Sequence, residues 1–233
     1  MSGIADRLRS VQERIARAAE RVGRDPSSIE LVAVSKTKTT AEVREAAEAG
    51  ARAFGENYVQ ELLRKREDLG DAVEWHYVGH LQTNKAKHLV PFCALIHSVD
   101  SVKLATEIDR RAREHGRRQP ILVEVKLSEE DTKFGIDAGE VASLAQAVRK
   151  LPGVDLRGLM VMPPFAEDPE ASRPYFVRLR RLRDALREAG LPAGSCTHLS
   201  MGMTGDFEVA IEEGATIVRV GTAIFGPRQP AGA

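Results

Sequence analysis

Short apolar runs alternate with amphipathic segments along most of this 233-residue sequence, and this alternation constrains the fold more than any other feature. The first run, LVAVSK at 31–36, is nearly all apolar and rich in β-branched residues, which is typical of a strand buried on both faces of a parallel sheet. Seven further runs predict strands at 52–55, 74–79, 94–98, 121–126, 156–162, 197–200 and 216–220. The segments between them predict helices, one beginning after Thr39 and the others at 57–69, 83–89, 101–115, 138–150, 172–189 and 205–213.

Strict alternation of strands and helices predicts a parallel sheet. Eight such units in roughly 200 residues fit a closed (β/α)8 TIM barrel, and an open doubly wound sheet of six or seven strands is the alternative. Ahead of the first strand, one apolar stripe predicts an extra N-terminal helix: Ile4, Leu8, Val11, Ile15, Ala18 and Val22. Because no linker or shift in composition interrupts the pattern, we expect residues 1–233 to form a single domain.

The composition argues against several classes of function. Lys+Arg and Asp+Glu both number 34, whereas a protein that works by attraction to nucleic-acid phosphates usually has a basic excess. No apolar run reaches the ~18 residues of a membrane helix, and charges interrupt the N-terminal segment throughout, unlike a signal peptide. The two cysteines, Cys93 and Cys196, form no paired motif. We therefore expect a cytoplasmic protein that binds neither nucleic acid nor membranes.

Two histidines raise the question of a metal site, because His76 and His80 are four residues apart. In a strand this spacing puts the two side chains on one face about 13 Å apart, which is too far for one ion. No zinc-type carboxylate motif accompanies them. We therefore expect no metal site.

Lysines follow or end two of the predicted strands. The carboxyl ends of barrel strands meet at one rim, where functional sites are built. Partial burial of Lys36 at this rim would lower its pKa and free a neutral amine, which can form a Schiff base with a carbonyl compound. Lys126 has a similar position and is the rival candidate. The plainer interpretation is a rim lysine that pairs with a carboxylate.

Two glycine-containing turns follow the last two strands, LSMGMTGDFE at 199–208 and RVGTAIFG at 219–226. Barrels often bind a phosphate at these two loops, and Ser200, Thr204 and Thr222 add hydroxyl donors. Ordinary tight turns are the alternative interpretation. A lysine amine and a phosphate site on one rim suggest a phosphorylated carbonyl compound, either pyridoxal 5′-phosphate (PLP) or the substrate of an aldolase.

Long motifs in this sequence resemble those of the YggS/PROSC family, the pyridoxal phosphate homeostasis proteins. The resemblance covers nearly the whole chain. It implies the fold of the N-terminal barrel of bacterial alanine racemase. The matching segments are LVAVSKTKTTAEVREAAEAGARAFGENYVQE (31–61), WHYVGHLQTNK (75–85), the Lys133–Gly135 turn, GLMVM (158–162), LSMGMTGDFEVAI (199–211) and RVGTAIFG (219–226).

The resemblance also implies a cofactor and its binding residues. PLP would be held as a covalent aldimine on Lys36, with Arg219 facing the pyridine nitrogen and Asn57 close to the cofactor. The phosphate would lie at Ser200, Gly221 and Thr222. An arginine stays charged and only donates hydrogen bonds, so it disfavours protonation of the pyridine nitrogen and makes the ring a weak electron sink.

The choice between racemase and carrier depends on a second acid–base group. A racemase needs such groups on both faces of the substrate carbon. In alanine racemase the second group is a tyrosine from a separate C-terminal domain, whereas this sequence ends at Ala233. We therefore expect a monomer without catalytic residues that binds PLP. It would store PLP, deliver it to PLP-dependent apoenzymes or keep its amount in the cell in balance. A small PLP-dependent amino-acid racemase and a Schiff-base aldolase without PLP are the alternatives.

Overall fold

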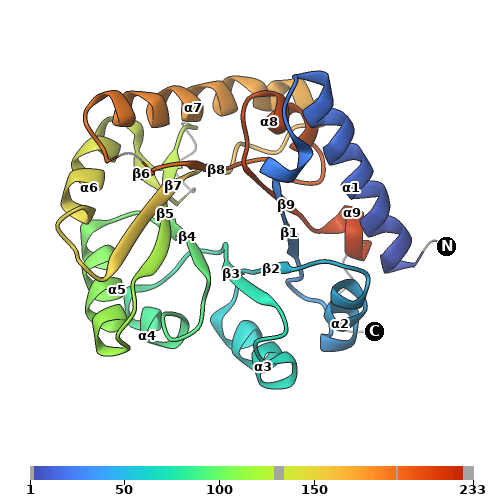
Figure 1. The fold of residues 1–233 in the computed structure, drawn as a ribbon, viewed down its shortest axis with the longest axis horizontal. Helices are drawn as coiled ribbons and strands as arrows, with labels where there is room; N and C mark the ends of the chain where they lie inside the picture. The colour runs from blue at the N-terminus through green and yellow to red at the C-terminus, as the bar shows by residue number, and fades with distance from the viewer. Residues whose placement is uncertain (1–2, 129–133, 193, 228–233) are drawn as a thin grey trace.

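Eight parallel strands close into a barrel in the computed structural model, which describes residues 3–128, 134–192 and 194–227 (Figure 1). Hydrogen bonding links them in the order β4-β3-β2-β1-β9-β8-β7-β5, and a further β4–β5 pairing closes the ring. This closure confirms the predicted barrel and excludes the open sheet. The strands are β1 (Glu30–Val34), β2 (Ala53–Glu56), β3 (Glu74–Tyr77), β4 (Leu95–Val99), β5 (Gln119–Lys126), β7 (Val154–Met160), β8 (His198–Ser200) and β9 (Ile217–Val220), while β6 (Ile136–Asp137) adds a short pairing to β5.

Helices surround the barrel (Figure 1). They are α1 (Ile4–Arg21), α2 (Thr40–Glu48), α3 (Val59–Leu69), α4 (Ala86–Leu89), α5 (Val102–Glu114), α6 (Val141–Val148), α7 (Arg173–Glu188), α8 (Phe207–Glu212) and α9 (Thr222–Phe225). Helix α2 begins at a capping box, in which the Thr39 hydroxyl accepts from the Glu42 N–H and the Glu42 carboxylate accepts from the Thr39 N–H. None of the helices in the described ranges is long and apolar enough to cross a membrane.

The predicted N-terminal helix is confirmed as α1, which packs against α2, α8 and α9 (Figure 1). Its apolar stripe is buried, from Ile4 to Ala18. Two arginines on the same helix fix its position, because Arg7 Nε donates to the Ile224 carbonyl at 2.6 Å and Arg14 pairs with Glu208 at 2.7 Å. The helix therefore covers the outside of the barrel beside β9 and β1.

Some predicted boundaries were wrong at the rim. The helix predicted at 83–89 is a 3-10 turn at Thr83–Lys85 followed by the single-turn α4. Helix α9 was not predicted, because four residues are too short to show helical periodicity. Strand β1 ends at Val34, since the chain turns sharply at Thr37, where φ is 66°. Lys36 therefore lies in a loop and not in the strand.

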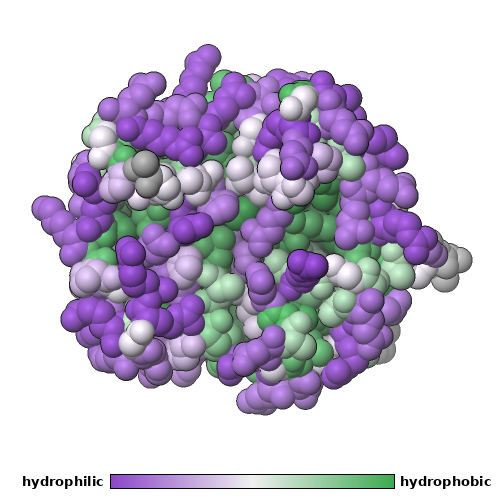
Figure 2. Space-filling view, viewed as in Figure 1, coloured by the Kyte–Doolittle hydropathy of each residue, from purple (hydrophilic) through white to green (hydrophobic). Residues whose placement is uncertain are grey.

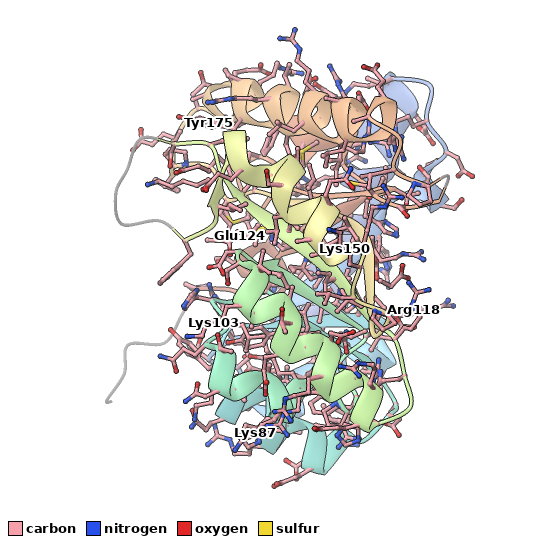
Figure 3. All side chains as sticks on the ribbon, turned by 90° about the vertical axis from the view of Figure 1, so that its left-hand side faces the viewer. Lys87, Lys103, Arg118, Glu124, Lys150 and Tyr175 are labelled. Atoms are coloured by element: carbon pink, nitrogen blue, oxygen red, sulfur yellow. The ribbon has the colours of Figure 1, made fainter. Side chains whose placement is uncertain are left out.

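The interior of the barrel is divided into an apolar layer and a polar layer. An apolar cluster fills its middle: Val32, Ala53, Leu95, Leu122, Met160 and Ile217. Two residues further along β4, β5 and β9, the next inward-facing side chains are His97, Glu124 and Arg219, all of them buried. Figure 3 shows Glu124 toward the same side of the molecule as Lys103, which lies in the first turn of α5, and Arg118 at the opposite side. A buried polar layer thus lies under the carboxyl-end rim.

The face at the amino ends of the strands is different in character. It is turned toward the viewer in Figure 2, and it is mostly hydrophilic with small apolar areas between the helices. The described residues with large exposed apolar side chains are few, and Tyr58, Phe134, Met162 and Phe165 among them follow strands at the carboxyl-end rim. The two faces therefore differ in what they expose to solvent.

Candidate functional site

A cavity of about 390 Å³ opens at the carboxyl ends of the strands. It collects residues from loops far apart in the sequence, because β1, β2, β7, β8 and β9 are neighbours in the barrel. The side chains and loops that line it are Val34, Lys36, Asn57, Val78, Met162, Pro164, Phe165, Ala166, Met203, Thr204, Gly205, Asp206, Arg219, Gly221 and Thr222. The structure thus brings together Lys36, Asn57, Arg219, Gly221 and Thr222, which the sequence analysis selected, and leaves Ser200 outside this lining.

Arg219 lies at the base of the cavity with only 3% of its surface exposed. Its Nη1 donates to the Ser200 hydroxyl at 2.6 Å, and its Nη2 donates to the Val161 carbonyl at 2.9 Å. Burial lowers the pKa of Arg219 to about 10, while the carboxylates of Glu124 and Asp206 oppose this change. The guanidinium is therefore charged and fixed at neutral pH.

Ser200 faces the interior of the barrel and not the cavity. Besides accepting from Arg219, its hydroxyl lies 2.9 Å from His97 Nδ1, and it is completely buried. The expectation that Ser200 contacts a phosphate thus has no support in this geometry. The sequence shows that a hydroxyl lies near the turn. What this hydroxyl contacts depends on the side chain of Ser200 pointing into the barrel from the end of β8. Thr204, four residues later in the loop, lines the cavity instead.

A chain of buried polar groups continues from Ser200 toward the other end of the barrel. His97 Nε2 lies 3.0 Å from His76 Nδ1, and His76 Nε2 faces Glu30 Oε1 at 3.5 Å. Since an arginine can only donate, Ser200 accepts from Arg219, and its hydroxyl can either donate to or accept from His97 Nδ1. The side chains of Arg219, Ser200, His97 and His76 thus form one continuous row of polar contacts.

The groups in this polar layer have shifted pKa values. Burial lowers the pKa of His76 to about 4 and that of His97 well below its usual value, with His76 and Arg219 adding to the effect on His97. Burial raises the pKa of Glu124 to about 7, with Asp100 adding to the rise and Arg219 opposing it. At neutral pH both imidazoles are therefore uncharged.

Replacing His97 with asparagine is expected to flatten the pH dependence of stability. Burial depresses the pKa of His97 in the folded state, so as the pH falls below about 6.5 the unfolded state gains a proton at this residue before the folded state does. The wild type should therefore lose up to about 1 kcal/mol of unfolding free energy per pH unit relative to His97→Asn as the pH falls. Urea unfolding of both proteins at several pH values measures this, and parallel curves would contradict a buried neutral His97.

The two candidate lysines differ in position. Lys36 lines the cavity, two residues beyond the end of β1. Lys126 is the last residue of β5 and is not among the residues that line it. The geometry therefore favours Lys36 over Lys126 as the amine that faces a bound molecule. Lys133, which belongs to one of the sequence motifs, lies outside the described residues.

Three features of the cavity lining suit a bound polar ligand. Asn57 Oδ1 is buried and has no hydrogen-bond partner within the described residues. At Gly221, a Cβ atom would lie 3.2 Å from the Val34 carbonyl, so a side chain there would crowd the end of β1. Thr204 Oγ1 accepts from the Ala223 N–H at 3.4 Å, which joins the two glycine turns. Together these features form a polar, glycine-lined edge of the cavity.

A neighbouring cavity of about 390 Å³ shares Asn57 with the first. It contains His80, whose ring stacks on Phe134 at 3.8 Å between centroids and whose Nδ1 lies 3.8 Å from Asp100. His76 and His80 therefore lie in different surroundings. One group of possible metal ligands occurs in the described ranges, Glu30, Glu74 and His76, whose atoms lie within 4.8 Å of one another. This group lies on β1 and β3, away from the cavity, and was not predicted from the sequence.

The sequence of this chain is similar to those of known proteins over nearly its full length. The family model for the N-terminal domain of alanine racemase matches residues 7–229. A pyridoxal phosphate homeostasis protein of Aquifex aeolicus is 47% identical over 228 residues, covering 96% of this chain and 98% of that protein. The protein of the same name from Escherichia coli K12 is 40% identical and covers 98% of both chains.

Solved structures show the same fold. PipY of Synechococcus elongatus PCC7942, solved with PLP bound, is 39% identical, has a TM-score of 0.84 and covers 96% of this chain and 100% of that one. An alanine racemase of Clostridium difficile 630 is 17% identical with a TM-score of 0.72, covering 94% of this chain but 56% of the racemase. The second likeness concerns the fold alone.

Proposed function

Since this chain belongs to the alanine racemase N-terminal domain family, and within it to the pyridoxal phosphate homeostasis proteins, we propose that it holds PLP reversibly as a Schiff base on Lys36 without catalytic turnover. One observation carries the proposal: Lys36 and the charged Arg219 line the same cavity. Lys36 is in the loop after β1, and Arg219 is on the neighbouring strand β9. PipY, a relative solved with PLP bound, supports the choice of cofactor.

The residues present fit PLP. Arg219 is a fixed cation at the base of the cavity, suited to donate to the pyridine nitrogen. Thr204, Gly221 and Thr222 line the glycine-lined edge of the cavity. There the hydroxyls and the first amide groups of α9 can donate to phosphate oxygens. The unpaired Asn57 Oδ1 offers an acceptor beside the ring. The proposal therefore places Asn57, Gly221 and Thr222 at the cofactor, with Thr204 rather than Ser200 as a hydroxyl donor to the phosphate.

When bound, PLP would supply an aldehyde, and Lys36 would supply the amine that holds it as a Schiff base, with the release of one water. Arg219 would hold a positive charge near the ring nitrogen and so oppose its protonation, which would weaken the ring as an electron sink. Among the described residues that line the cavity there is no tyrosine or histidine to act as a second acid–base group. These features support binding without turnover.

The exposed apolar side chains near the cavity support delivery to another protein. Phe165 lines the cavity and is 91% exposed, and Met162 beside it is 41% exposed. Exposed apolar patches at a binding site are typical of protein contacts. We include PLP-dependent apoenzymes as recipients in the proposal, with the chain itself acting as a cytoplasmic monomer.

The test uses the wild-type protein freed of cofactor. On addition of PLP, we expect a yellow absorbance band that borohydride abolishes, and peptide mapping should then find one reduced label, on Lys36. An assay for racemisation of amino acids should show no turnover above that of free PLP. A colourless protein would sink the cofactor proposal in favour of a Schiff-base aldolase. Racemisation that depends on Lys36 would establish a small PLP-dependent racemase instead.

A further inference from the structure

A buried lysine, Lys65 on α3, lies directly beneath the loop that carries Lys36. It is 2% exposed, and its ammonium makes three short contacts. Lys65 Nζ donates to Glu56 Oε1 at 2.6 Å, to Glu61 Oε1 at 2.8 Å and to the backbone carbonyl of Ser35 at 2.6 Å. The Ser35 hydroxyl also donates to Glu56 Oε1, at 2.6 Å. The proposed binding of PLP uses none of these groups, although the cluster lies next to Lys36 in the chain.

The cluster holds both peptide groups that flank Lys36. On one side, Lys65 binds the carbonyl of Ser35. On the other side, the N–H of Thr37 donates to Glu61 Oε1 at 2.6 Å, and Glu61 is in turn bound by Lys65. The backbone between these two bonds therefore has little freedom, and it is here that the chain leaves the barrel wall toward the cavity.

The turn held in this way has an unfavourable backbone conformation. Thr37 has φ of 66°, in the left-handed region, which a β-branched residue rarely adopts. Such a conformation persists only where surrounding contacts enforce it, and it is common at functional sites. The Lys38 N–H closes this turn by donating to the Ser35 carbonyl at 3.0 Å, and the bonds from Lys65 to Ser35 and from Thr37 to Glu61 hold the turn in place. Burial raises the pKa of Glu56, and the nearby ammonium of Lys65 opposes this rise and so favours the ionised carboxylate.

We propose that Lys65 is a positioning residue for Lys36: through Ser35 and Glu61 it fixes the strained turn that aims the Lys36 amine into the cavity. This inference rests on the proposed function, because it assigns the cluster to the same Schiff-base reaction. A cluster that served stability alone would change the melting temperature and leave the reactivity of Lys36 unaltered. The two roles can therefore be separated by measurement.

The experiment compares the cofactor-free full chain as wild type, Lys65→Met and Arg64→Met. Arg64 is the exposed neighbour on α3 and serves as the matched control. PLP is added, the reaction is stopped with borohydride at timed intervals, and peptide mapping measures the label on Lys36. A small misplacement of a reacting group has a large effect on rate, so Lys65→Met should label Lys36 about tenfold more slowly than the wild type and Arg64→Met at the wild-type rate.

A second substitution distinguishes a misplaced Lys36 amine from a general disruption of the fold. Adding Thr37→Gly to Lys65→Met removes the cost of the left-handed turn, so the labelling rate should recover about fivefold although no contact is restored. Two readouts without PLP accompany these rates. Acetic anhydride should acetylate Lys36 of the cofactor-free Lys65→Met protein at an altered rate, and the amide hydrogen of Thr37 should exchange faster.

The outcomes separate the inference from the proposed function. If Lys65→Met labels Lys36 at the wild-type rate below its melting temperature, the positioning role is overturned while PLP binding stands. If the wild type itself gives no label on Lys36, the proposed function fails. Should Lys65→Met not fold, Glu61→Ala decides, because it keeps the Lys65–Glu56 pair and removes the acceptor of the Thr37 N–H. It should slow labelling about threefold, and an unchanged rate would overturn the inference.

Discussion

Replacing Lys36 with alanine is expected to remove the yellow absorbance band and the one-to-one borohydride-stable label that PLP gives the wild-type protein. The variant lacks the amine that the cavity directs toward a bound aldehyde, and the phosphate and ring contacts alone form no covalent bond. Because Lys36 lies in a loop beyond the end of β1, its truncation should leave the fold intact. Absorbance titration with PLP, followed by borohydride and mass measurement, provides the test.

Lys126→Ala is the matched control for this prediction. Lys126 also ends a barrel strand, but it is not among the residues that line the cavity, so its loss should leave band and label unchanged. If Lys36→Ala kept a stoichiometric band while Lys126→Ala lost it, the assignment of the Schiff base to Lys36 would be wrong, although PLP binding would stand.

Arg219→Met is expected to lower the affinity for PLP about a hundredfold. A hydrogen bond to a charged group contributes about 1.5–3 kcal/mol, and the substitution removes the only guanidinium among the described residues that line the cavity. It also removes the donors to Ser200 and to the Val161 carbonyl, both buried, so we expect a lower melting temperature as well. Equilibrium titration with PLP below that temperature measures the affinity.

Arg173→Met controls for the general loss of an arginine with several partners. Arg173 pairs with Glu170, Glu212 and Glu213 at 2.6–2.7 Å, and its side chain is 31% exposed, outside the cavity. Surface ion pairs contribute little, so its removal should cost about 1 kcal/mol or less and leave the affinity for PLP unchanged. An Arg219→Met protein that bound PLP as tightly as the wild type would show that the guanidinium does not contact the cofactor.

Much of the fold is predictable from local pattern. The apolar run before Lys36 and its seven successors identify the barrel strands, and the stripe from Ile4 to Val22 identifies α1. These predictions succeeded because a strand or a long helix repeats its buried positions every few residues. Helix α9 and the exact end of β1 were not predictable in this way, because a four-residue helix and a single left-handed residue at Thr37 leave no periodic signal.

Some residues of the candidate site could likewise be predicted from the sequence, and others could not. Lys36 and the turns at Gly221 and Thr222 could be selected because they follow predicted strands, whose carboxyl ends must share one rim in a parallel barrel. The contacts of Ser200 were not predictable in this way, because they depend on what lies across the barrel, namely His97 and Arg219. Lys65 was not identified at all. In the sequence it is one more charged residue of a helix, and only packing against Glu56 shows that it is buried.

The sequence by itself therefore determined the alternating strands and helices, the extra helix and the rim on which Lys36 lies, since these follow from patterns among residues near one another in the chain. The β4–β5 pairing decided that the sheet closes into a barrel. The tertiary structure alone decided which hydroxyl faces the cavity, what holds Arg219 and what fixes the turn at Lys36. Those answers depend on side chains from β1, β2, β4, β8, β9 and α3 that meet only when the barrel closes. The energy of a buried charge or hydrogen bond depends on such distant partners, and no local periodicity encodes them.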